Sequence, residues 1–229
     1  MSGFRRHIMA RLATRSTYPY IEGYAFDVDG VYPAQVNIRY NGSYHAITVN
    51  QDTGYFREDV ELTTLQYCLQ DDTSVRLIHV YAPNKTLHTG SFARRSNAEV
   101  IDLSNIVSTS IYVAFGVNSS DYSSGYRCKI NSVKLPSITN TTNVNATFAN
   151  ATLLTDVEAT FIEQSLNMQW SPLTLQSAIN ILKALRDVTS YGGKTLSFSA
   201  TTSALVQADT TAMLLVAQAQ ANGWTITFN

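Results

Sequence analysis

The amino-acid sequence predicts a mixed α+β fold, with a small N-terminal antiparallel β domain, a short repeat solenoid and a C-terminal α/β cap. Two alternating apolar runs are joined by Asn41-Gly42, apolar residues recur at a fixed spacing through the middle of the chain, and helical and strand patterns alternate near the C-terminus. These three observations also set the boundaries. We expect an N-terminal arm at 1–20, the β domain at 21–60, the solenoid at 61–160 and the cap at 161–229.

The N-terminal arm is basic. Its first sixteen residues contain Arg5, Arg6, Arg11 and Arg15 and no acidic residue. We interpret these arginines as a candidate docking arm for an acidic socket on a partner; the alternative is a solvated chain terminus. No apolar run of the length found in secretory signals follows them, so we expect no export signal.

The β domain is predicted from a hairpin. Residues 35–40 and 43–49 alternate apolar and polar side chains on either side of Asn41-Gly42. Asn and Gly tolerate the positive φ angles of a type I′ turn, which makes this the strongest short hairpin signal. A second turn at 51–54 precedes another short apolar run. Together these features predict a small antiparallel sheet.

The middle of the chain repeats a set of four apolar anchors. Counted from the first anchor of a copy, the others follow six, nine and eleven residues later, except that one copy fits only if polar residues near 118–127 are an insertion. The copies are Leu69, Val75, Ile78 and Val80; Phe92, Ala98, Ile101 and Leu103; Phe115, Ile130, Val133 and Leu135; and Phe148, Leu154, Val157 and Ala159. Successive first anchors from Leu69 to Phe115 are 23 residues apart. A period in the twenties with one short strand per unit predicts a leucine-rich-repeat-like solenoid, in which each unit buries its apolar face by stacking on a neighbour.

These residues resemble a known family. The segments FARRSNAEVIDLS at 92–104 and FANATLLTDVEAT at 148–160 are similar to BspA-type leucine-rich repeats, whose units read roughly F-x5-L-x2-[IV]-x-L. The stretch at 195–229 resembles the tail found on such repeats in structural proteins of phages of gut bacteria. The resemblance covers roughly residues 60–229, and it departs from the pattern at Ala98 and at the insertion after Phe115.

The resemblance implies a non-enzymatic structural or adhesion component of a virion, such as a head fibre, tail fibre or baseplate part. Its expected partners are sister copies and other virion proteins, with a host-surface glycan or protein as a further possibility. The alternative is a cell-surface recognition protein that binds host protein or glycan through its repeats. An enzyme that cleaves surface polysaccharide would need a cleft with paired carboxylates, which the sequence does not indicate.

The composition excludes two classes of partner. The net charge of −1 argues against a nucleic-acid binder that depends on phosphate contacts. No stretch approaches the roughly 18 apolar residues of a membrane span, so we expect no membrane partner. Only 14% of the residues are charged, and a polar surface with little charge suits a protein in contact with copies or neighbours.

The polar insertion at 118–127 is the candidate contact loop. A segment that interrupts a repeat without destroying it should project from the stack, and Tyr122, Tyr126 and Asp121 lie on it. Tyrosine with serine and glycine is the mixture that recognition loops favour. The alternative is a tolerated surface insertion.

The cap is predicted from helix and strand signals. Ser171-Pro172 indicates a helix start, because serine accepts hydrogen bonds from early backbone N–H groups and proline suits the first helical position. Gly192-Gly193 should end that element, and Asn222-Gly223 should cap a second helix. Strands on either side of the second helix predict a parallel pair with a right-handed crossover. The apolar residues of these elements are Leu175, Ala178, Ile179, Leu182 and Leu185; Leu196 and Phe198; Ala212, Leu215, Val216 and Ala219; and Trp224, Ile226 and Phe228.

The sequence offers one catalytic resemblance, AFDVDGVY at 25–32. It is similar to the nucleophile motif of haloacid-dehalogenase-type phosphatases, in which Asp27 would attack phosphorus, Asp29 would handle the leaving group, and both would help to hold Mg²⁺. That chemistry needs a strand-to-helix context in a Rossmann-like fold, whereas here Pro33 and the hairpin follow. We therefore place both aspartates at a turn, with a surface Ca²⁺ as a minor alternative. We expect no catalytic residue, no metal site and no cofactor.

Histidine and cysteine give no ligand pattern. The four histidines have no metal-ligand spacing. We expect His79, between two apolar anchors, to be a satisfied surface histidine on the outer face of its strand. Cys68 and Cys128 form no C-x-x-C pair and define no disulfide framework, so we expect them to behave as small apolar residues.

Overall fold

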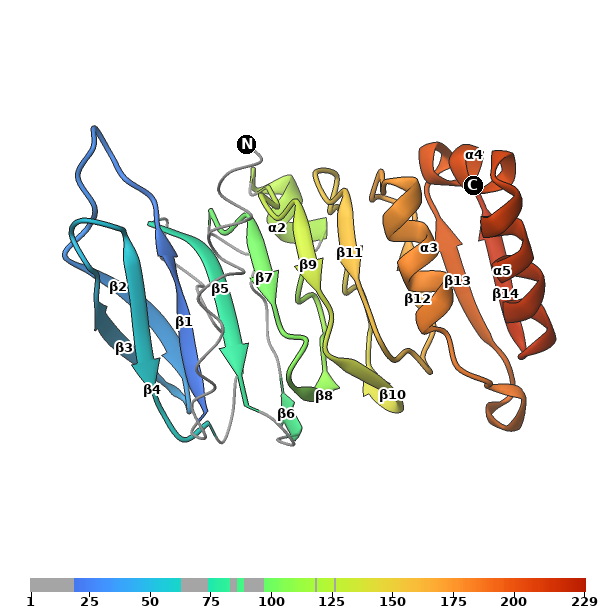
Figure 1. The fold of residues 1–229 in the computed structure, drawn as a ribbon, viewed down its shortest axis with the longest axis horizontal. Helices are drawn as coiled ribbons and strands as arrows, with labels where there is room; N and C mark the ends of the chain where they lie inside the picture. Colours follow the sequence, from blue (N-terminus) through green and yellow to red (C-terminus); the bar gives the residue numbers. More distant parts are fainter. Residues whose placement is uncertain (1–18, 63–73, 83–85, 89–96, 118, 126) are drawn as a thin grey trace.

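A computed structural model of the 229-residue chain describes residues 19–62, 74–82, 86–88, 97–117, 119–125 and 127–229. The fold is a mixed α+β arrangement in which strands follow one another along the long axis and α3, α4 and α5 gather at the C-terminal end (Figure 1). In the part of the chain that the structure describes, every helix is too short or too polar to cross a membrane.

The largest sheet has six strands. Their order is β11 (Asp156–Glu158), β9 (Ser132–Lys134), β7 (Val100–Asp102), β5 (Val75–Tyr81), β1 (Tyr20–Ala25) and β4 (Tyr55–Asp59). The four strands from the repeat region, β5, β7, β9 and β11, are parallel to one another. Strand β1 is antiparallel to both β4 and β5, so the N-terminal region extends the sheet of the repeat region.

The third anchors of the four predicted copies form one row across this sheet. Ile78 pairs with Ile101, Ile101 with Val133, and Val133 with Val157. Each of these side chains is at most 1% exposed. The predicted alignment of strand anchors is therefore confirmed. The first anchors Leu69 and Phe92 lie outside the described residues, whereas the rings of Phe115 and Phe148 stack with centroids 5.6 Å apart.

The repeat region also contains a second, parallel sheet. Its order is β10 (Ser137–Asn143), β8 (Val107–Ser110) and β6 (Thr86–His88). Beyond these strands, two successive turns are joined by backbone hydrogen bonds from Phe115 N to Thr147 O and from Val117 N to Ala149 O, at 3.0 and 2.6 Å. Successive coils of the repeat region therefore pair at two strands, and the coils that contain 111–117 and 143–149 also contact each other at a turn.

The predicted hairpin is confirmed. Strands β2 (Gln35–Tyr40) and β3 (Ser43–Thr48) are antiparallel, and Asn41 and Gly42 have φ angles of 47° and 82°. Both turn residues thus adopt the left-handed region that a type I′ turn requires. Its buried face, which includes the fully buried Val36 and Ile38, joins the same core as the large sheet.

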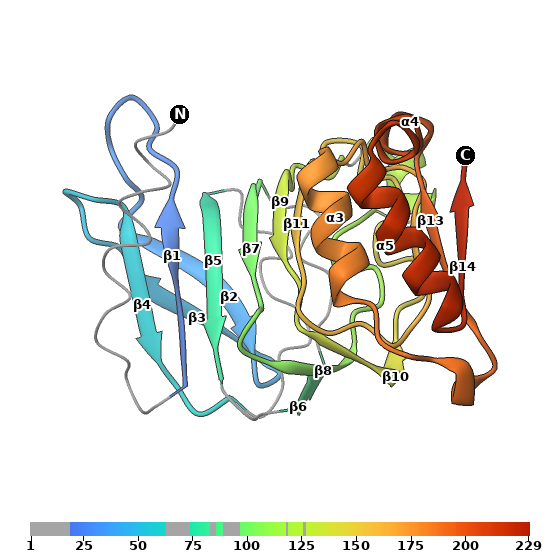
Figure 2. The same cartoon turned by 45° about the vertical axis from the view of Figure 1, so that its right-hand side comes forward.

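The C-terminal region contains a third sheet and most of the helices. Strands β12 (Leu166–Met168), β13 (Lys194–Phe198) and β14 (Trp224–Phe228) are parallel, and the helices are α3 (Leu175–Ala184), α4 (Ala200–Ala208) and α5 (Thr210–Ala221). Figure 2 shows α3 and α5 side by side, and α3 packs against both α5 and β11. The parallel pair β13–β14 and the α5 helix between them are as predicted; α4 was not foreseen.

The start of the first cap helix was predicted wrongly. Helix α3 begins at Leu175, and its N-cap is Thr174, whose hydroxyl accepts a hydrogen bond from Ser177 N. The hydroxyl of Ser171 instead donates to Ala151 O at 3.3 Å, in the preceding turn of the chain. Ser171 is fully buried in this contact, so a long-range interaction has replaced the local cap.

The end of that helix also differs from the expectation. Helix α3 ends at Ala184, because Leu185 has an extended backbone and forms a bridge with Ile162. Gly192, in the left-handed region at φ 82°, ends a separate 3-10 turn at Thr189–Tyr191. The glycine pair therefore terminates a later and shorter element than the sequence indicated.

Candidate functional site

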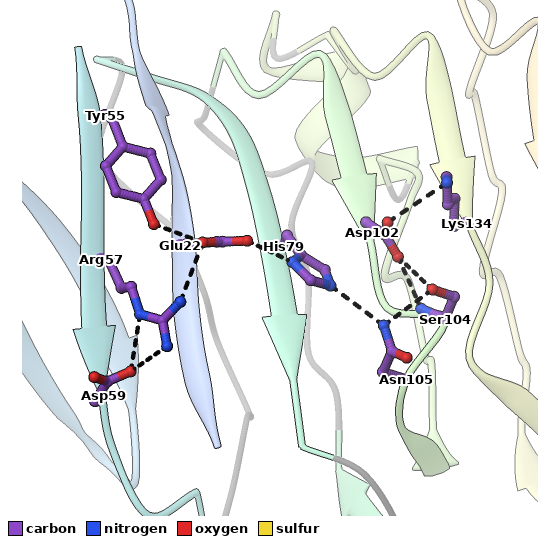
Figure 3. Close-up of polar contacts among 9 residues, drawn as sticks. All are labelled: Glu22, Tyr55, Arg57, Asp59, His79, Asp102, Ser104, Asn105 and Lys134. Carbon is purple, nitrogen blue, oxygen red and sulfur yellow. Dashed lines mark hydrogen bonds and ion pairs between the residues drawn. The ribbon is translucent and has the colours of Figure 1, made fainter. Parts of the chain in front are cut away.

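A row of charged side chains crosses the outer face of the six-stranded sheet. Side chains alternate between the two faces of a strand, so the residue that follows each buried third anchor points outward. Those residues and their partners on β1 and β4 fall in one register across the six strands. We call this set the charged row; its members are Arg57, Glu22, His79, Asp102, Lys134 and Glu158. Figure 3 shows five of them and the polar residues that contact them.

Glu22 is the centre of the N-terminal half of the row. Tyr55 Oη donates to Glu22 Oε2 at 2.6 Å, His79 Nδ1 lies 3.0 Å from Oε1, and the Arg57 guanidinium lies 3.7 Å from Oε2 (Figure 3). Burial pushes the pKa of Glu22 upward, but the hydrogen bonds from His79 and Tyr55 and the nearby charges outweigh it and hold the pKa below its ordinary value. The carboxylate is therefore kept ionised by its neighbours.

The same contacts act on Tyr55 and Arg57. Burial, and then the hydrogen bond to the Glu22 carboxylate, raise the pKa of the Tyr55 phenol, so that the hydroxyl remains a donor. Arg57 also pairs with Asp59 at 2.7 Å, and its guanidinium lies over the Tyr20 ring, 3.8 Å from the centroid. Burial alone would lower the pKa of Arg57, but the Asp59 contact raises it above the ordinary value. These interactions join β4, β1 and β5 on their outer face.

His79 is buried between two partners. Its Nδ1 faces the Glu22 carboxylate at 3.0 Å, and its Nε2 lies 3.3 Å from Asn105 Nδ2, so both ring nitrogens have a protein partner. The expected satisfied histidine on the outer face is found, but the expectation of a surface position is corrected, since His79 is only 8% exposed. The physical reason is strand β1, which places Glu22 beside the imidazole and the Tyr20 ring edge-on to it, with centroids 5.7 Å apart.

The C-terminal half of the row is more open. Asp102 Oδ1 accepts hydrogen bonds from Ser104 N and Ser104 Oγ at 3.0 and 2.7 Å. Lys134 Nζ lies 3.8 Å from Asp102 and 3.3 Å from Glu158, whose side chain is 63% exposed. The pair with the exposed Glu158 contributes at most about 1 kcal/mol, whereas the pair with Asp102 is partly buried, at 28% and 21% exposure of the two side chains.

The polar groups of the charged row bond to one another. A general base needs a lone pair directed at a substrate, but Asn105 occupies His79 Nε2, and the Ser104 hydroxyl donates to Asp102 and not to an imidazole. Among the described residues, no group of three or more His, Cys, Asp and Glu side chains could hold a metal ion. The charged row is therefore a set of mutually paired side chains on an exposed sheet face.

The sequence-predicted contact residues lie elsewhere. The insertion contains a short helix, α2 (Ser119–Ser123), where a projecting loop was expected. Tyr122 is 37% exposed, and Arg127 covers its ring at 4.0 Å while donating to Tyr122 O at 2.8 Å. Tyr126 and the Asp121 side chain lie outside the described residues, as do the four arginines of the arm, Arg5, Arg6, Arg11 and Arg15.

The aspartates of the phosphatase-like motif occupy a turn, as predicted. Val28 and Val31 form an isolated antiparallel bridge around Asp29 and Gly30, which have φ angles of 54° and 78°. Asp27 and Asp29 are both exposed. The motif thus leads into a tight turn and not into the helix that the phosphatase chemistry needs.

The charged row itself was not predicted, although part of its signal is present in the sequence. His79, Asp102, Lys134 and Glu158 each follow directly after the third anchor of a copy. Glu22 and Arg57 carry no repeat signal, because they join the row through antiparallel pairing of strands outside the repeat.

Compared with known protein families, curated proteins and solved structures, the chain matches none.

Proposed function

We propose that the chain is a non-enzymatic structural or adhesion component of a bacteriophage particle, built on a short leucine-rich-repeat-like solenoid. The observation that carries the solenoid interpretation is the row of third anchors, Ile78, Ile101, Val133 and Val157, which are register partners on parallel strands. In a solenoid, each unit contacts only its neighbours and buries its apolar side by stacking on them.

The path of the chain supports this interpretation. Each passage runs from a strand of the large sheet to a strand of the second sheet, as from β5 to β6, from β7 to β8 and from β9 to β10. After β11, the chain extends the second sheet (β6, β8 and β10) by a single parallel bridge, between Ile138 and Ile162. Both ladders therefore advance by one strand for each passage, as stacked coils require.

The two ends of the repeat region also fit a solenoid. The antiparallel strands β1 and β4 cover one end of the ladder, and helix α3 packs against β11 at the other. Covering the ends in this way protects backbone groups that would otherwise pair with other chains. The charged row presents side chains that satisfy one another, which suits a scaffold better than an enzyme.

The phage setting rests on the resemblance of the stretch at 195–229 to the tail found on such repeats in structural proteins of phages of gut bacteria. In this setting, the arginines of the arm would dock on the particle, and the repeats would face sister copies or the host surface. Closed symmetric assemblies of identical chains are the usual form of such parts.

Particles purified from a lysate of the phage–host pair that encodes the chain provide the test. We expect peptides of this chain in mass spectra of the particles, at a constant ratio to a head or tail protein through a density gradient, and immunogold labelling on a defined part of the particle. A non-structural protein from the same lysate should be removed by the gradient and is the control. Recovery of the chain in the cell envelope, with none in the particles, would overturn the virion proposal and favour the cell-surface alternative.

A further inference from the structure

A pocket of about 440 Å³ opens on the outer face of the third sheet, and none of its lining residues belongs to the charged row. Its floor is formed by β12 and β13, and one wall by the turn at 144–149 that follows β10. The volume lies within the range of about 300–1,000 Å³ that is typical of small-molecule sites. Neither the repeat pattern nor the charged row accounts for this pocket.

The floor is a grid of uncharged polar side chains. On β12 and β13, Leu166, Met168, Leu196 and Phe198 are buried in the core. The intervening residues face outward, and the parallel register places Asn167 beside Ser197, while Thr195 N donates to Ser165 Oγ at 3.0 Å. Strand β14 continues both rows with Thr225 beside Thr195 and Thr227 beside Ser197.

Several groups of this floor are available to a ligand. Within the described residues, the hydroxyls of Thr195 and Ser197 and the side-chain amide of Asn145 contact no protein hydrogen-bond partner. Asn167 Oδ1 accepts from Gln169 N at 3.1 Å, which fixes the amide and leaves its Nδ2 donor for other contacts. The pocket thus offers donors and acceptors in fixed positions.

One wall carries an exposed aromatic ring. Trp170 lines the pocket in the turn after β12 and is 48% exposed, whereas Trp224, the other tryptophan, is 3% exposed and donates to Arg186 O. An indole left half in water presents a large apolar face beside a polar floor. The opposite wall is held in place by Thr147, whose hydroxyl donates to Ile111 O and Val144 O.

The chemistry of this lining selects one class of ligand. The lining residues that the structure describes include no Asp, Glu, Lys, Arg or His, so an ionic ligand would lose its hydration without gaining a counter-charge. A purely apolar ligand would leave the hydroxyls and amides of the floor desolvated and unpaired. A sugar ring avoids both costs, because its C–H face can stack on the indole while its hydroxyls both donate to and accept from Ser, Thr and Asn.

From these observations we infer that the pocket between Trp170 and the Asn167–Ser197 grid binds a neutral saccharide, with room for a mono- or disaccharide unit. The inference gives the adhesive role of the proposed function a ligand class, and rests on that function only for its biological setting. Binding to the purified chain is a property of the pocket alone.

The test uses the purified full chain and saturation-transfer NMR with free sugars. The neutral probes are glucose, galactose, mannose, N-acetylglucosamine and their disaccharides; sialic acid and glucuronic acid form the charged set. We expect transfer to at least one neutral sugar and a titratable change in the emission of Trp170, while the emission of buried Trp224 stays constant. Transfer to no neutral sugar, or to charged sugars alone, would overturn the inference.

Variants locate the binding. Trp170→Ala should weaken binding of the responding sugar by about tenfold or more, since it removes the stacking surface. Thr195→Val and Ser197→Ala remove single hydroxyls with little change in volume, and together should weaken it by a similar factor. Tyr44→Ala, at an aromatic residue that is 53% exposed on the distant β3 strand, is the matched control and should change nothing.

The second pair of substitutions keeps the test decisive if Trp170→Ala fails to fold. Unchanged affinity in the folded Thr195→Val/Ser197→Ala variant, or in folded Trp170→Ala, would remove the site from this pocket. Sugar binding by a chain that is absent from purified particles would overturn the virion setting and leave the pocket in place. A chain that is present in the particles but binds no neutral sugar would overturn the saccharide inference and leave the virion proposal in place.

Discussion

Replacing Ile101 by alanine tests the strand alignment on which the fold depends. Ile101 is fully buried at the middle of the row of third anchors, between Ile78 on β5 and Val133 on β9. The substitution removes three carbons, worth about 0.8 kcal/mol each as buried methylene groups, and leaves a cavity between two neighbours. We therefore expect the free energy of unfolding to fall by about 2–5 kcal/mol, and by about 0.5–1.5 kcal/mol for Ile101→Val.

The matched control is the adjacent residue on the same strand. Val100 points to the outer face and is only half-buried, so Val100→Ala should cost less than about 1 kcal/mol. Because side chains alternate between faces, a strand shifted by one residue would exchange the roles of Val100 and Ile101. The pair of substitutions therefore reads out which face of β7 is in the core.

Urea unfolding provides the assay. Far-ultraviolet circular dichroism reports on all strands, whereas both tryptophans, Trp170 and Trp224, lie in the C-terminal region. Coincident transitions by the two signals would show that the chain unfolds as one unit and would allow a linear extrapolation to water. Equal losses for Ile101→Ala and Val100→Ala, or a larger loss for Val100→Ala, would refute the alignment.

Two further predictions concern titratable groups, the partly buried Glu22 and the buried Cys128. The pKa of Glu22 is lowered in the folded chain, so its ionisation contributes stability that is present above the ordinary carboxyl pKa and is lost as the pH falls through the lower folded value. Glu22→Gln should therefore lower the free energy of unfolding by about 1–3 kcal/mol at neutral pH and by progressively less below about pH 4. Urea unfolding at a series of pH values measures this loss, with the exposed Glu158→Gln as the control. An equal loss at all pH values, or the same pH profile in Glu158→Gln, would contradict the prediction. Burial raises the pKa of the Cys128 thiol to about 11. In a Cys68→Ser background at pH 8, we expect a thiol reagent to modify the folded protein more than about a hundredfold more slowly than the protein in urea, and comparable rates would show that Cys128 is accessible.

Local signals predicted those elements whose geometry is decided locally. The turn at Asn41-Gly42 needs positive φ at both positions, and these two residue types supply it without help from the rest of the chain. Ser171-Pro172 is an equally good local signal, and it was wrong. The Ser171 hydroxyl donates a hydrogen bond to Ala151 O, twenty residues earlier. A contact of this kind depends on how two distant segments stack, so it cannot be predicted from the residues next to Ser171.

The same distinction applies to the charged row. Its repeat members follow the third anchors at a fixed position, so period alone could have placed His79, Asp102, Lys134 and Glu158 on one face. The burial of His79 could not be predicted in this way. It depends on β1 lying antiparallel beside β5, and strand pairing between separate regions is not encoded by a residue spacing.

The two halves of the charged row contribute differently to the choice of register. Slipping β1 by two residues against β5 would keep its apolar face inward, but would move Glu22 from His79 to a position beside Leu77 or Tyr81. A carboxylate buried without its partners is strongly destabilising, so the contacts with His79 and Tyr55 exclude these registers, which the apolar residues alone would allow. The pairs of Lys134 with Asp102 and Glu158 are more open to solvent and exert a weaker selection. The junction between the N-terminal strands and the repeat strands, where no repeat period can set the alignment, is therefore where the polar contacts are most buried.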